Sequence, residues 1–316
     1  MPRQSKLPKQ LQPMLATLID APFDGRDWVF ESKWDGFRIV AAIEERSVTL
    51  YSRNGLIVSD NYMPIAKALE KVRKDAVIDG ELVAVDEHGI SRFQLLQNAL
   101  RTAANLHYCV FDLMFLDGKD LRGLPLVERK ERLRALLPKD PLLIYSEHLA
   151  EHGKRYFKEA QKAGLEGIMA KRAQSRYLSG ARSKDWLKIK TAKRQEVVVV
   201  GFTAPRRTRP LFGALVLAVR KGNAWQYVGR VGTGFSHASL EAIHAKLWPL
   251  RTPSSPFTQR VKDEAVTTWV KPKLVAEVRF TEWTDAGEMR HPAFLGLRTD
   301  KKPTDVVLEK EARPPK

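Results

Sequence analysis

Short apolar runs alternate with tight turns between residues 28 and 89. β-Branched and aromatic residues recur in short pieces bounded by Asp-Gly, Asn-Gly or His-Gly, a pattern typical of antiparallel strands. These runs cover residues 28–36, 37–45, 47–55 and 76–89. Three further segments, residues 61–74, 126–137 and 153–164, place apolar residues three or four positions apart, as amphipathic helices do. The first part of the chain is therefore predicted to be α+β.

The pattern changes after the basic stretch at residues 188–195. Strand-like runs then occupy residues 197–204, 214–234 and 269–284, with glycine turns between them and one helical segment at residues 236–248. Short strands, glycine turns and a single helix favour a small β-barrel. We predict two domains, residues 1–193 and residues 194–316, each long enough to bury its own core.

Positive charge dominates the composition and indicates a polyanionic partner. The chain has 54 Lys and Arg against 37 acidic residues, a net charge of +17. Residues 171–210 hold twelve of the cations, with only Asp185 and Glu196 as acids. Clustered cations bind nucleic acid through its phosphates and release counterions, whereas a merely solvated surface mixes both signs. We therefore expect a nucleic-acid surface in this stretch.

The single cysteine, Cys109, and the absence of a long apolar stretch exclude other classes. One cysteine makes neither an internal disulfide nor a four-cysteine zinc site, and its apolar surroundings predict a buried, unreactive thiol. No run approaches the roughly 18 apolar residues of a membrane span, and the N-terminus lacks the pattern of a signal peptide. A cytoplasmic location without a membrane partner is expected.

Lys33 lies between Glu31 and Arg38, where one predicted strand ends and the next begins. Asp35 and Gly36 form a tight turn, and Arg38 returns a second cation to the neighbourhood of the lysine. An amine with a pKa of about 10.4 is almost fully protonated at neutral pH, so a nucleophilic lysine needs nearby positive charge or a metal ion. Arg38 and a bound magnesium ion would supply it. Lys33 is therefore the candidate nucleophile.

Around Lys33 the chain resembles the covalent nucleotidyltransferases, which comprise ATP-dependent DNA ligases, RNA ligases and mRNA capping enzymes. The Lys-x-Asp-Gly element at residues 33–36 defines that superfamily, and five further elements follow in its order at residues 51–55, 79–82, 111–118, 166–171 and 186–190. A weaker match, residues 294–301, resembles the Arg-x-Asp-Lys element of ligase OB-fold barrels. The resemblance is closest to bacterial end-joining ligase modules. It implies a nucleotidyltransferase domain followed by an OB-fold β-barrel.

The resemblance also implies a role for each matched residue. Lys33 would carry AMP, and Phe111 would stack on the adenine. Glu81 and Glu166 would contact the ribose or Mg²⁺ (or Mn²⁺), and the sequence leaves open which carboxylate does which. The other residues expected around the nucleotide are Glu31, Ser32, Arg38, Arg53, Lys171, Lys188, Lys190 and Arg298.

The basic residues of this set are expected to contact different partners. Lys171, Lys188 and Lys190 would stabilise negative charge on the transferred α-phosphate if the fold gathers them. Arg53 would hold the 5′-phosphate of a nick. In the second domain, Arg298 and Lys301 would close over the β- and γ-phosphates of ATP, and Lys301 would also contact DNA.

These observations predict an ATP-dependent DNA ligase, with repair or end joining as its role. NAD is disfavoured as the donor, because relatives that use it carry a four-cysteine zinc site. Three alternatives stay open: a GTP-dependent capping-type enzyme, an RNA ligase, and a non-catalytic OB-fold module in which Lys33 is inert. We expect a monomer in the bacterial nucleoid that acts on nicked duplex DNA, with Ku or a polymerase module as candidate partners.

Overall fold

A computed structural model describes residues 7, 11–93, 95–96, 105–205, 210–259, 261, 264–309 and 312–315. The chain divides into two units: Met1–Thr191 with Glu311–Lys316 form unit 1, and Ala192–Lys310 form unit 2. The predicted second domain, residues 194–316, includes the last segment that belongs here to unit 1. The reason is backbone pairing, since Ala312 bridges Ile19 and accepts a hydrogen bond from the Asp20 amide at 3.1 Å.

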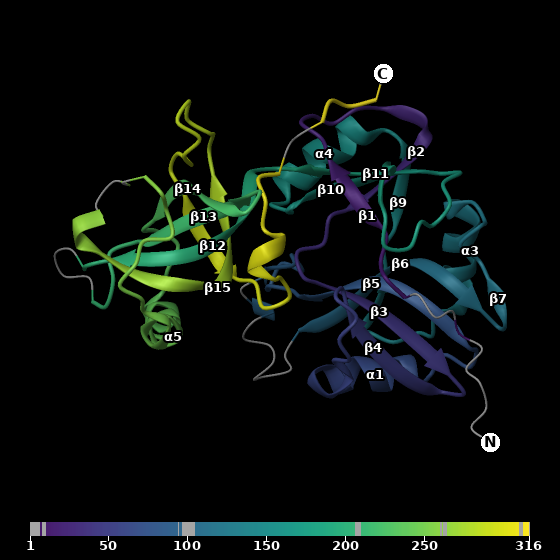
Figure 1. Ribbon diagram of the computed structural model, residues 1–316. Coiled ribbons are helices and arrows are strands. Elements are labelled where there is room, and N and C mark those ends of the chain that lie inside the picture. Colours follow the sequence, from purple (N-terminus) through teal and green to yellow (C-terminus); the bar gives the residue numbers. More distant parts are fainter. Residues whose placement is uncertain are drawn as a thin grey trace. The chain divides into compact units, whose positions relative to one another are not determined.

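The first sheet of unit 1 has the strand order β1-β11-β10-β2-β9 (Figure 1). Its strands are β1 (Leu15–Leu18), β2 (Gly25–Ser32), β9 (His148–Glu151), β10 (Gly167–Arg172) and β11 (Arg182–Lys190). β1 runs parallel to β11, and the other neighbours are antiparallel. Ser32 pairs with Ile168, so the end of β2 lies beside the start of β10.

The second sheet of unit 1 has the order β4-β3-β5-β6-β7, and β8 pairs with β6. Its strands are β3 (Phe37–Glu44), β4 (Ser47–Ser52), β5 (Ala76–Ala84), β6 (Leu106–Leu116), β7 (Lys119–Asp120) and β8 (Leu143–Tyr145). Asp79 pairs with Asp112 and Gly80 with Val110, so the register skips Phe111. Such a bulge turns a side chain away from the regular alternation of the strand.

A buried cluster lies between the two sheets of unit 1. Val29 and Trp186 enter it from the first sheet, and Val40, Val77 and Phe111 enter it from the second. On β3 the neighbours of Val40, Ile39 and Ala41, belong to a different buried cluster, as the alternation of side chains along a strand requires. The shared cluster fixes the two sheets relative to each other, because each fully buried large apolar side chain contributes roughly 1.5–3 kcal/mol.

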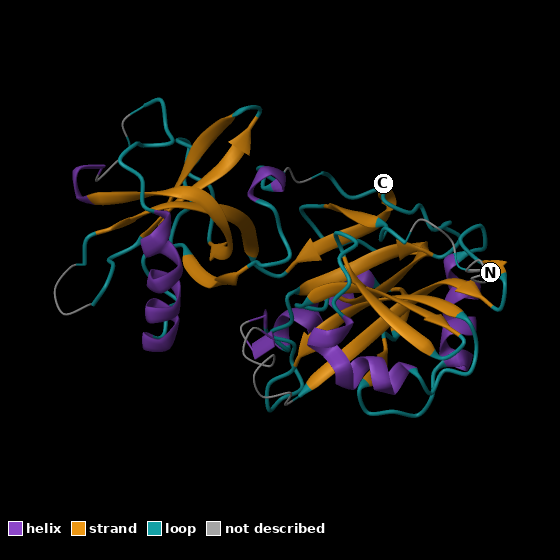
Figure 2. Cartoon of the chain, turned by 60° about the horizontal axis from the view of Figure 1, so that its bottom comes forward, coloured by secondary structure: helices purple, strands orange, loops and turns teal. Residues whose placement is uncertain are grey.

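Among the described residues of unit 1, the helices α1 (Met63–Leu69), α3 (Leu126–Leu136) and α4 (Gly153–Lys162) pack against the sheets. α1 buries Ile65 and Leu69 in the cluster formed by the outer face of the second sheet. α4 packs Ala160 against Phe30 of β2, and the chain leaves the helix at Gly164, whose φ of +71° favours glycine. Figure 2 shows these helices beside sheets that make up most of the regular structure.

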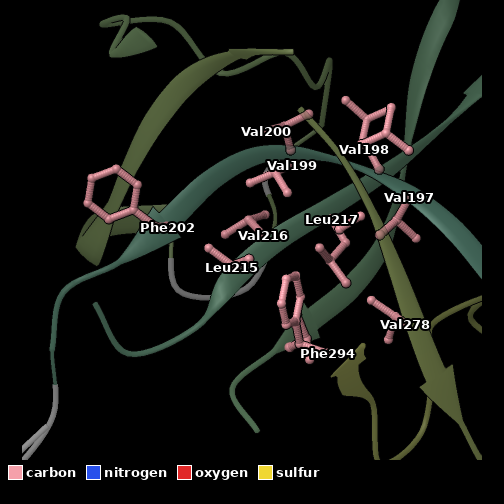
Figure 3. Packing of buried hydrophobic residues seen from close by; sticks show 14 of the residues in the cluster. Val197, Val198, Val199, Val200, Phe202, Leu215, Val216, Leu217, Val278 and Phe294 are labelled. Carbon is pink, nitrogen blue, oxygen red and sulfur yellow. The ribbon is translucent and has the colours of Figure 1, made fainter. Parts of the chain in front are cut away.

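The described residues of unit 2 form an antiparallel sheet of order β14-β13-β12-β15-β16, accompanied by the helix α5. Its elements are β12 (Lys193–Thr203), β13 (Leu215–Lys221), β14 (Ala224–Val231), α5 (His237–Leu247), β15 (Thr267–Phe280) and β16 (Ala293–Leu297). Successive side chains of a strand point to opposite faces, yet Val197–Val200 of β12 are all fully buried (Figure 3). Both faces of this central strand are therefore covered.

The structure confirms the predicted α+β class, with sheets as the larger part. Each predicted helical segment contains a helix: α1 within 61–74, α3 within 126–137, α4 within 153–164 and α5 within 236–248. Ser236 and Ser239 cap the start of α5 reciprocally, with N–H to Oγ distances of 3.2 and 2.9 Å. In the described part of the chain, no helix has both the length and the apolar character to cross a bilayer.

Candidate active site

Lys33 follows directly after β2, at the turn into β3. Its backbone N–H donates to the Gly167 carbonyl at 3.0 Å, which ties the turn to β10. The Asp35 N–H donates to Ser91 Oγ at 3.1 Å. At Gly36 a Cβ atom would lie 2.0 Å from the Leu82 carbonyl oxygen, so only glycine fits beside β5. The turn therefore holds Lys33 between the two sheets of unit 1.

Glu166 receives the Lys33 side chain. Lys33 Nζ forms an ion pair with Glu166 Oε2, with 19% of the Lys33 side chain and 3% of the Glu166 side chain exposed. Glu166 lies directly before β10, and its carbonyl accepts a hydrogen bond from the Thr191 N–H at 3.0 Å. The pairing of β2 with β10 thus brings together two residues that lie far apart in the sequence.

Strand register places the predicted cations of β10 and β11 on one face. Met169 pairs with Lys188 and Lys171 with Trp186 across these strands. Side chains two positions apart share a face, so Lys188 and Lys190 lie on the face of Trp186, which points into the cluster between the sheets. Both lysines are half-buried. Their position fits the predicted contact with a phosphate, and that contact stays a prediction.

Lys171 is buried and ion-paired, with 1% of its surface exposed. Its Nζ lies 2.8 Å from Glu31 Oε2 and 4.3 Å from the ring centroids of both Phe111 and Trp186. Burial lowers the pKa of Lys171 to about 8, assisted by the charge of Lys130 and opposed by Glu31. The sequence predicted phosphate stabilisation by Lys171, and the structure places this lysine against the rings of Phe111 and Trp186.

Glu31 binds two lysines at once. Lys130 Nζ lies 2.7 Å from Glu31 Oε1 and donates to the Ser146 carbonyl at 2.9 Å, while Lys171 takes the other carboxylate oxygen. Burial by itself raises the pKa of Glu31, but the two ammonium groups outweigh it and hold that pKa below its usual value. Ser32, the next residue, turns away and shares a hydrogen bond of 3.0 Å with the Tyr156 hydroxyl.

Arg38 is fixed against Asp79 on the neighbouring strand. Its Nε and Nη2 each lie 2.6 Å from one oxygen of Asp79, which also accepts a 2.5 Å hydrogen bond from the Tyr177 hydroxyl. Burial alone would lower the pKa of Arg38, but Asp79 raises it well above its ordinary value, so the guanidinium stays charged. The guanidinium carbon of Arg38, Cζ, lies 4.6 Å from the Phe111 ring centroid. Arg38 therefore supplies a permanent positive charge beside the site.

The remaining predicted site residues of unit 1 are Glu81, Arg53 and Phe111. Glu81 is half-buried and pairs with Arg38 across β3 and β5. Arg53 lies half-buried in the turn after β4. Phe111 has 6% of its surface exposed and meets Trp186 edge-on at 6.3 Å. The roles expected for these residues in binding metal, nick phosphate and adenine stay predictions.

In unit 2, Arg298 and Lys301 are paired with carboxylates of the same unit. Arg298 Nε and Nη2 each lie 2.8 Å from Asp300, and Nη1 lies 3.4 Å from Glu277. Lys301 Nζ lies 2.8 Å from Glu196. Burial lowers the pKa of Arg298, and the surrounding carboxylates more than reverse this effect. The predicted triphosphate ligands thus form an ion-pair cluster within unit 2.

The sequence did not predict four residues that contact the predicted site residues: Lys130, Asp79, Tyr177 and Trp186. Lys130 lies in a helix rich in both charge signs, where the sequence predicts solvent exposure. Asp79 and Trp186 stand inside matched elements, so the elements themselves were the available signal. Tyr177 gave none, because its contact with Asp79 joins residues 98 positions apart.

Comparison with known families identifies the class of protein. A model described as the ATP dependent DNA ligase domain matches residues 13–190, and one for the ATP dependent DNA ligase C terminal region matches residues 208–301. The first match covers more than half of the chain. The chain therefore belongs to the ATP-dependent DNA ligases.

The relatives with similar sequences include end-joining proteins. The chain is 39% identical over 323 residues to the multifunctional non-homologous end joining protein LigD of Pseudomonas aeruginosa, covering 99% of this chain and 38% of that protein. It is 39% identical over 305 residues to LigD of Mycobacterium tuberculosis, covering 95% and 40% respectively. The chain thus spans about two fifths of the length of these relatives.

A solved structure supports the fold. The structure titled mycobacterial DNA ligase D complexed with ATP and MES is similar with a TM-score of 0.71 and 36% identity, covering 94% of this chain and 97% of that one. The ligase domain of M. tuberculosis LigD is similar with a TM-score of 0.53 and 37% identity, covering 94% and 98%. The likeness therefore extends over nearly the whole chain.

Proposed function

We propose that this chain carries AMP on Lys33 and uses it to seal nicks between a 3′-hydroxyl and a 5′-phosphate in duplex DNA. The observation that carries the proposal is the meeting of Lys33, at the glycine turn after β2, with Glu166 at the start of β10. Lys188 and Lys190 share the face of the cluster that Lys33 approaches. An amine on a strand end, facing cations that bind phosphate, suits transfer of a nucleotidyl group.

The reaction would run in three steps. The Lys33 ammonium loses one proton to solvent, and the resulting amine attacks the α-phosphorus of ATP; pyrophosphate leaves with the electron pair of the broken P–O bond, and the nitrogen releases its second proton to solvent. The nick's 5′-phosphate oxygen then attacks the same phosphorus, which releases Lys33 and forms a DNA-adenylate. Finally the 3′-hydroxyl, giving its proton to solvent, attacks the 5′-phosphorus, and AMP leaves with the electron pair of the broken P–O bond. Arg38, charged and held by Asp79, would stabilise negative charge in the first two steps.

Phosphate chemistry of this kind implies Mg²⁺ or Mn²⁺. The residues present fit such an ion, because Glu166 already binds a cation, the Lys33 ammonium, and Glu81 on β5 of the second sheet is a further carboxylate oxygen donor in unit 1. Glu166 and Glu81 would hold the ion, which would offset the charge of the phosphates. Phe111 would receive the adenine, and Arg53 would hold the nick phosphate.

For unit 2 we propose an OB-fold barrel that binds DNA and completes the first step through Arg298 and Lys301. Its helix α5 lies between the third and fourth strands in sequence, and β12 is flanked by β13 and β15. A parallel bridge between Thr233 and Ala293, with a Phe294 N–H to Thr233 carbonyl distance of 2.9 Å, brings the ends of the sheet together. These features support a closed five-stranded barrel.

The biological setting belongs to the same proposal. The relatives are named for non-homologous end joining, and this chain matches about two fifths of their length. We infer that the chain acts in DNA repair at the nucleoid, as a monomeric ligase unit that works with Ku or a polymerase module. The net charge of +17 supports DNA as its substrate.

Labelling with nucleotide tests the proposal directly. With ATP labelled at the α-phosphate, the native chain should retain label through denaturing electrophoresis, and Lys33→Ala should retain none, because the variant lacks the nucleophile. Lys154→Ala, at an exposed lysine of α4, is the matched control and should label normally. A labelled band of native intensity on Lys33→Ala would overturn the assignment. Labelling by GTP in place of ATP would instead indicate the capping-type reaction.

A further inference from the structure

α3 carries a fully buried lysine, Lys130, whose ammonium group lies in the site. Lys130 has none of its surface exposed, lies 2.7 Å from Glu31 Oε1, donates to the Ser146 carbonyl and stands 4.8 Å from the Tyr145 ring centroid. Its helix packs on β6 of the second sheet, while Glu31 belongs to β2 of the first. Lys130 therefore links the two sheets through the residue two positions before Lys33.

The charges around Glu31 exceed what folding requires. Among the described contacts, Glu31 and Asp112 face three buried cations, because Arg129 binds both oxygens of Asp112 while Lys130 and Lys171 share Glu31. A buried carboxylate needs one cationic partner to offset its desolvation, and a second buried ammonium adds a desolvation cost of its own. A purely structural ion pair would therefore omit either Lys130 or Lys171.

Lys130 controls the position of Lys171. Lys130 takes Oε1 and Lys171 takes Oε2, so the carboxylate of Glu31 is held at both oxygens and cannot rotate freely. Without Lys130, both oxygens would be available to Lys171. The Glu31 carboxylate would then be free to rotate, and the Lys171 ammonium that it holds at 2.8 Å would move with it from its place 4.3 Å from the centroids of the Phe111 and Trp186 rings.

We propose that Lys130 is a positioning residue for the nucleotide pocket: by sharing Glu31 it sets Lys171 against Phe111 and Trp186, and so tunes the affinity for ATP. The inference rests on the proposed function, in which Phe111 receives the adenine. The excess positive charge also favours a polyanionic ligand, because a bound triphosphate lies in the field of an ammonium that Glu31 does not neutralise.

Binding measured in the Lys33→Ala background separates affinity from reaction. Calorimetry should give a Kd for ATP at least tenfold higher for Lys33→Ala/Lys130→Met than for Lys33→Ala. Lys130→Arg, which keeps the charge, should recover most of the loss. Arg132→Met removes the same charge from the exposed face of α3 and should leave the Kd within about twofold.

A second measurement distinguishes positioning from folding. In the Lys33-containing chain, Lys130→Met should raise the KM for ATP in adduct formation while kcat and the joining of a pre-adenylated nick change less than threefold. Equal ATP affinity with and without Lys130 would overturn the inference, as would an equal loss of adduct formation and joining accompanied by a large fall in Tm. If Lys33→Ala itself binds no ATP, the proposed function fails first.

Discussion

Lys171 carries its charge in surroundings that favour the neutral amine. It is fully buried, faces Glu31, and has Lys130 and Asp112 as the other charged neighbours that influence its pKa. Burial is the largest of these influences, and it brings the pKa to about 8 from an ordinary value of 10.5. The folded protein therefore gives up this proton at a lower pH than the unfolded chain does, and stability depends on pH in that interval.

Comparison with Lys171→Met should isolate this dependence. Between pH 8 and 10.5 the unfolded chain binds more protons at residue 171, so the native protein should gain stability relative to the variant as pH rises. The gain from pH 8 to 9.5 should be on the order of 1–2 kcal/mol, measured by urea unfolding. Lys71→Met is the matched control, because it removes a lysine whose side chain is largely exposed. A difference independent of pH would mean that Lys171 titrates normally.

At the scale of elements, the turn from β2 into β3 depends on one close approach. A Cβ atom on Gly36 would stand 2.0 Å from the Leu82 carbonyl oxygen and 3.0 Å from its carbon, both in the backbone of β5. The backbone of a central strand cannot yield without disturbing its pairing. The glycine of the Lys-x-Asp-Gly element is therefore required by the contact between the turn and β5, and Lys33 owes its position to that contact.

Gly36→Ala should therefore damage both stability and chemistry. We expect the free energy of unfolding to fall by about 2–4 kcal/mol, since overpacking against backbone forces strands apart. AMP-adduct formation should fall more than tenfold even at temperatures where the variant is folded. Gly123→Ala is the matched control, because an added Cβ meets nothing within 4 Å there. Native behaviour of Gly36→Ala in both assays would contradict this account of the turn.

The elements also show where sequence reasoning reaches its limit. The helices around residues 65, 130, 157 and 243 were predictable because their apolar residues repeat at helical spacing, and the turn at Gly36 because Asp-Gly ends a strand-like run. The bulge that displaces Phe111 depends on the register between β5 and β6, which hydrophobic alternation alone does not specify. Lys130 was unpredictable, because its burial follows from an acid 99 positions earlier.

At the scale of the whole molecule, unit 2 keeps both of its proposed phosphate ligands, Arg298 and Lys301, in contact with its own carboxylates. Arg298 is bound by Asp300 and Glu277, and Lys301 by Glu196, all within unit 2. To bind a triphosphate these cations must exchange carboxylates for phosphates. This exchange is needed only while pyrophosphate is present, and so only for the first step.

The variants Arg298→Ala and Arg53→Ala should therefore be defective in different steps of the reaction. Arg298→Ala should lose most AMP-adduct formation and still join a nick that already carries AMP, because no pyrophosphate remains to be oriented. Arg53→Ala should lose joining of the same pre-adenylated nick by more than tenfold, because the nick phosphate is needed after adenylation. Single-turnover joining without ATP measures both. Equal, severe joining defects in the two variants would refute the division of roles between the units.

Cys109 gives the molecule a practical property that follows from its place in β6. It is the only cysteine of the chain, it has none of its surface exposed, and burial raises the pKa of its thiol well above the usual range. The thiolate is the nucleophile that attacks a thiol reagent, so the folded native chain, whose thiol is buried and protonated, should take up no dye. Cysteines introduced at exposed Lys154 and Lys246 would then be the reactive pair, and fluorescence transfer between them would report the separation of the two units at each step of the reaction.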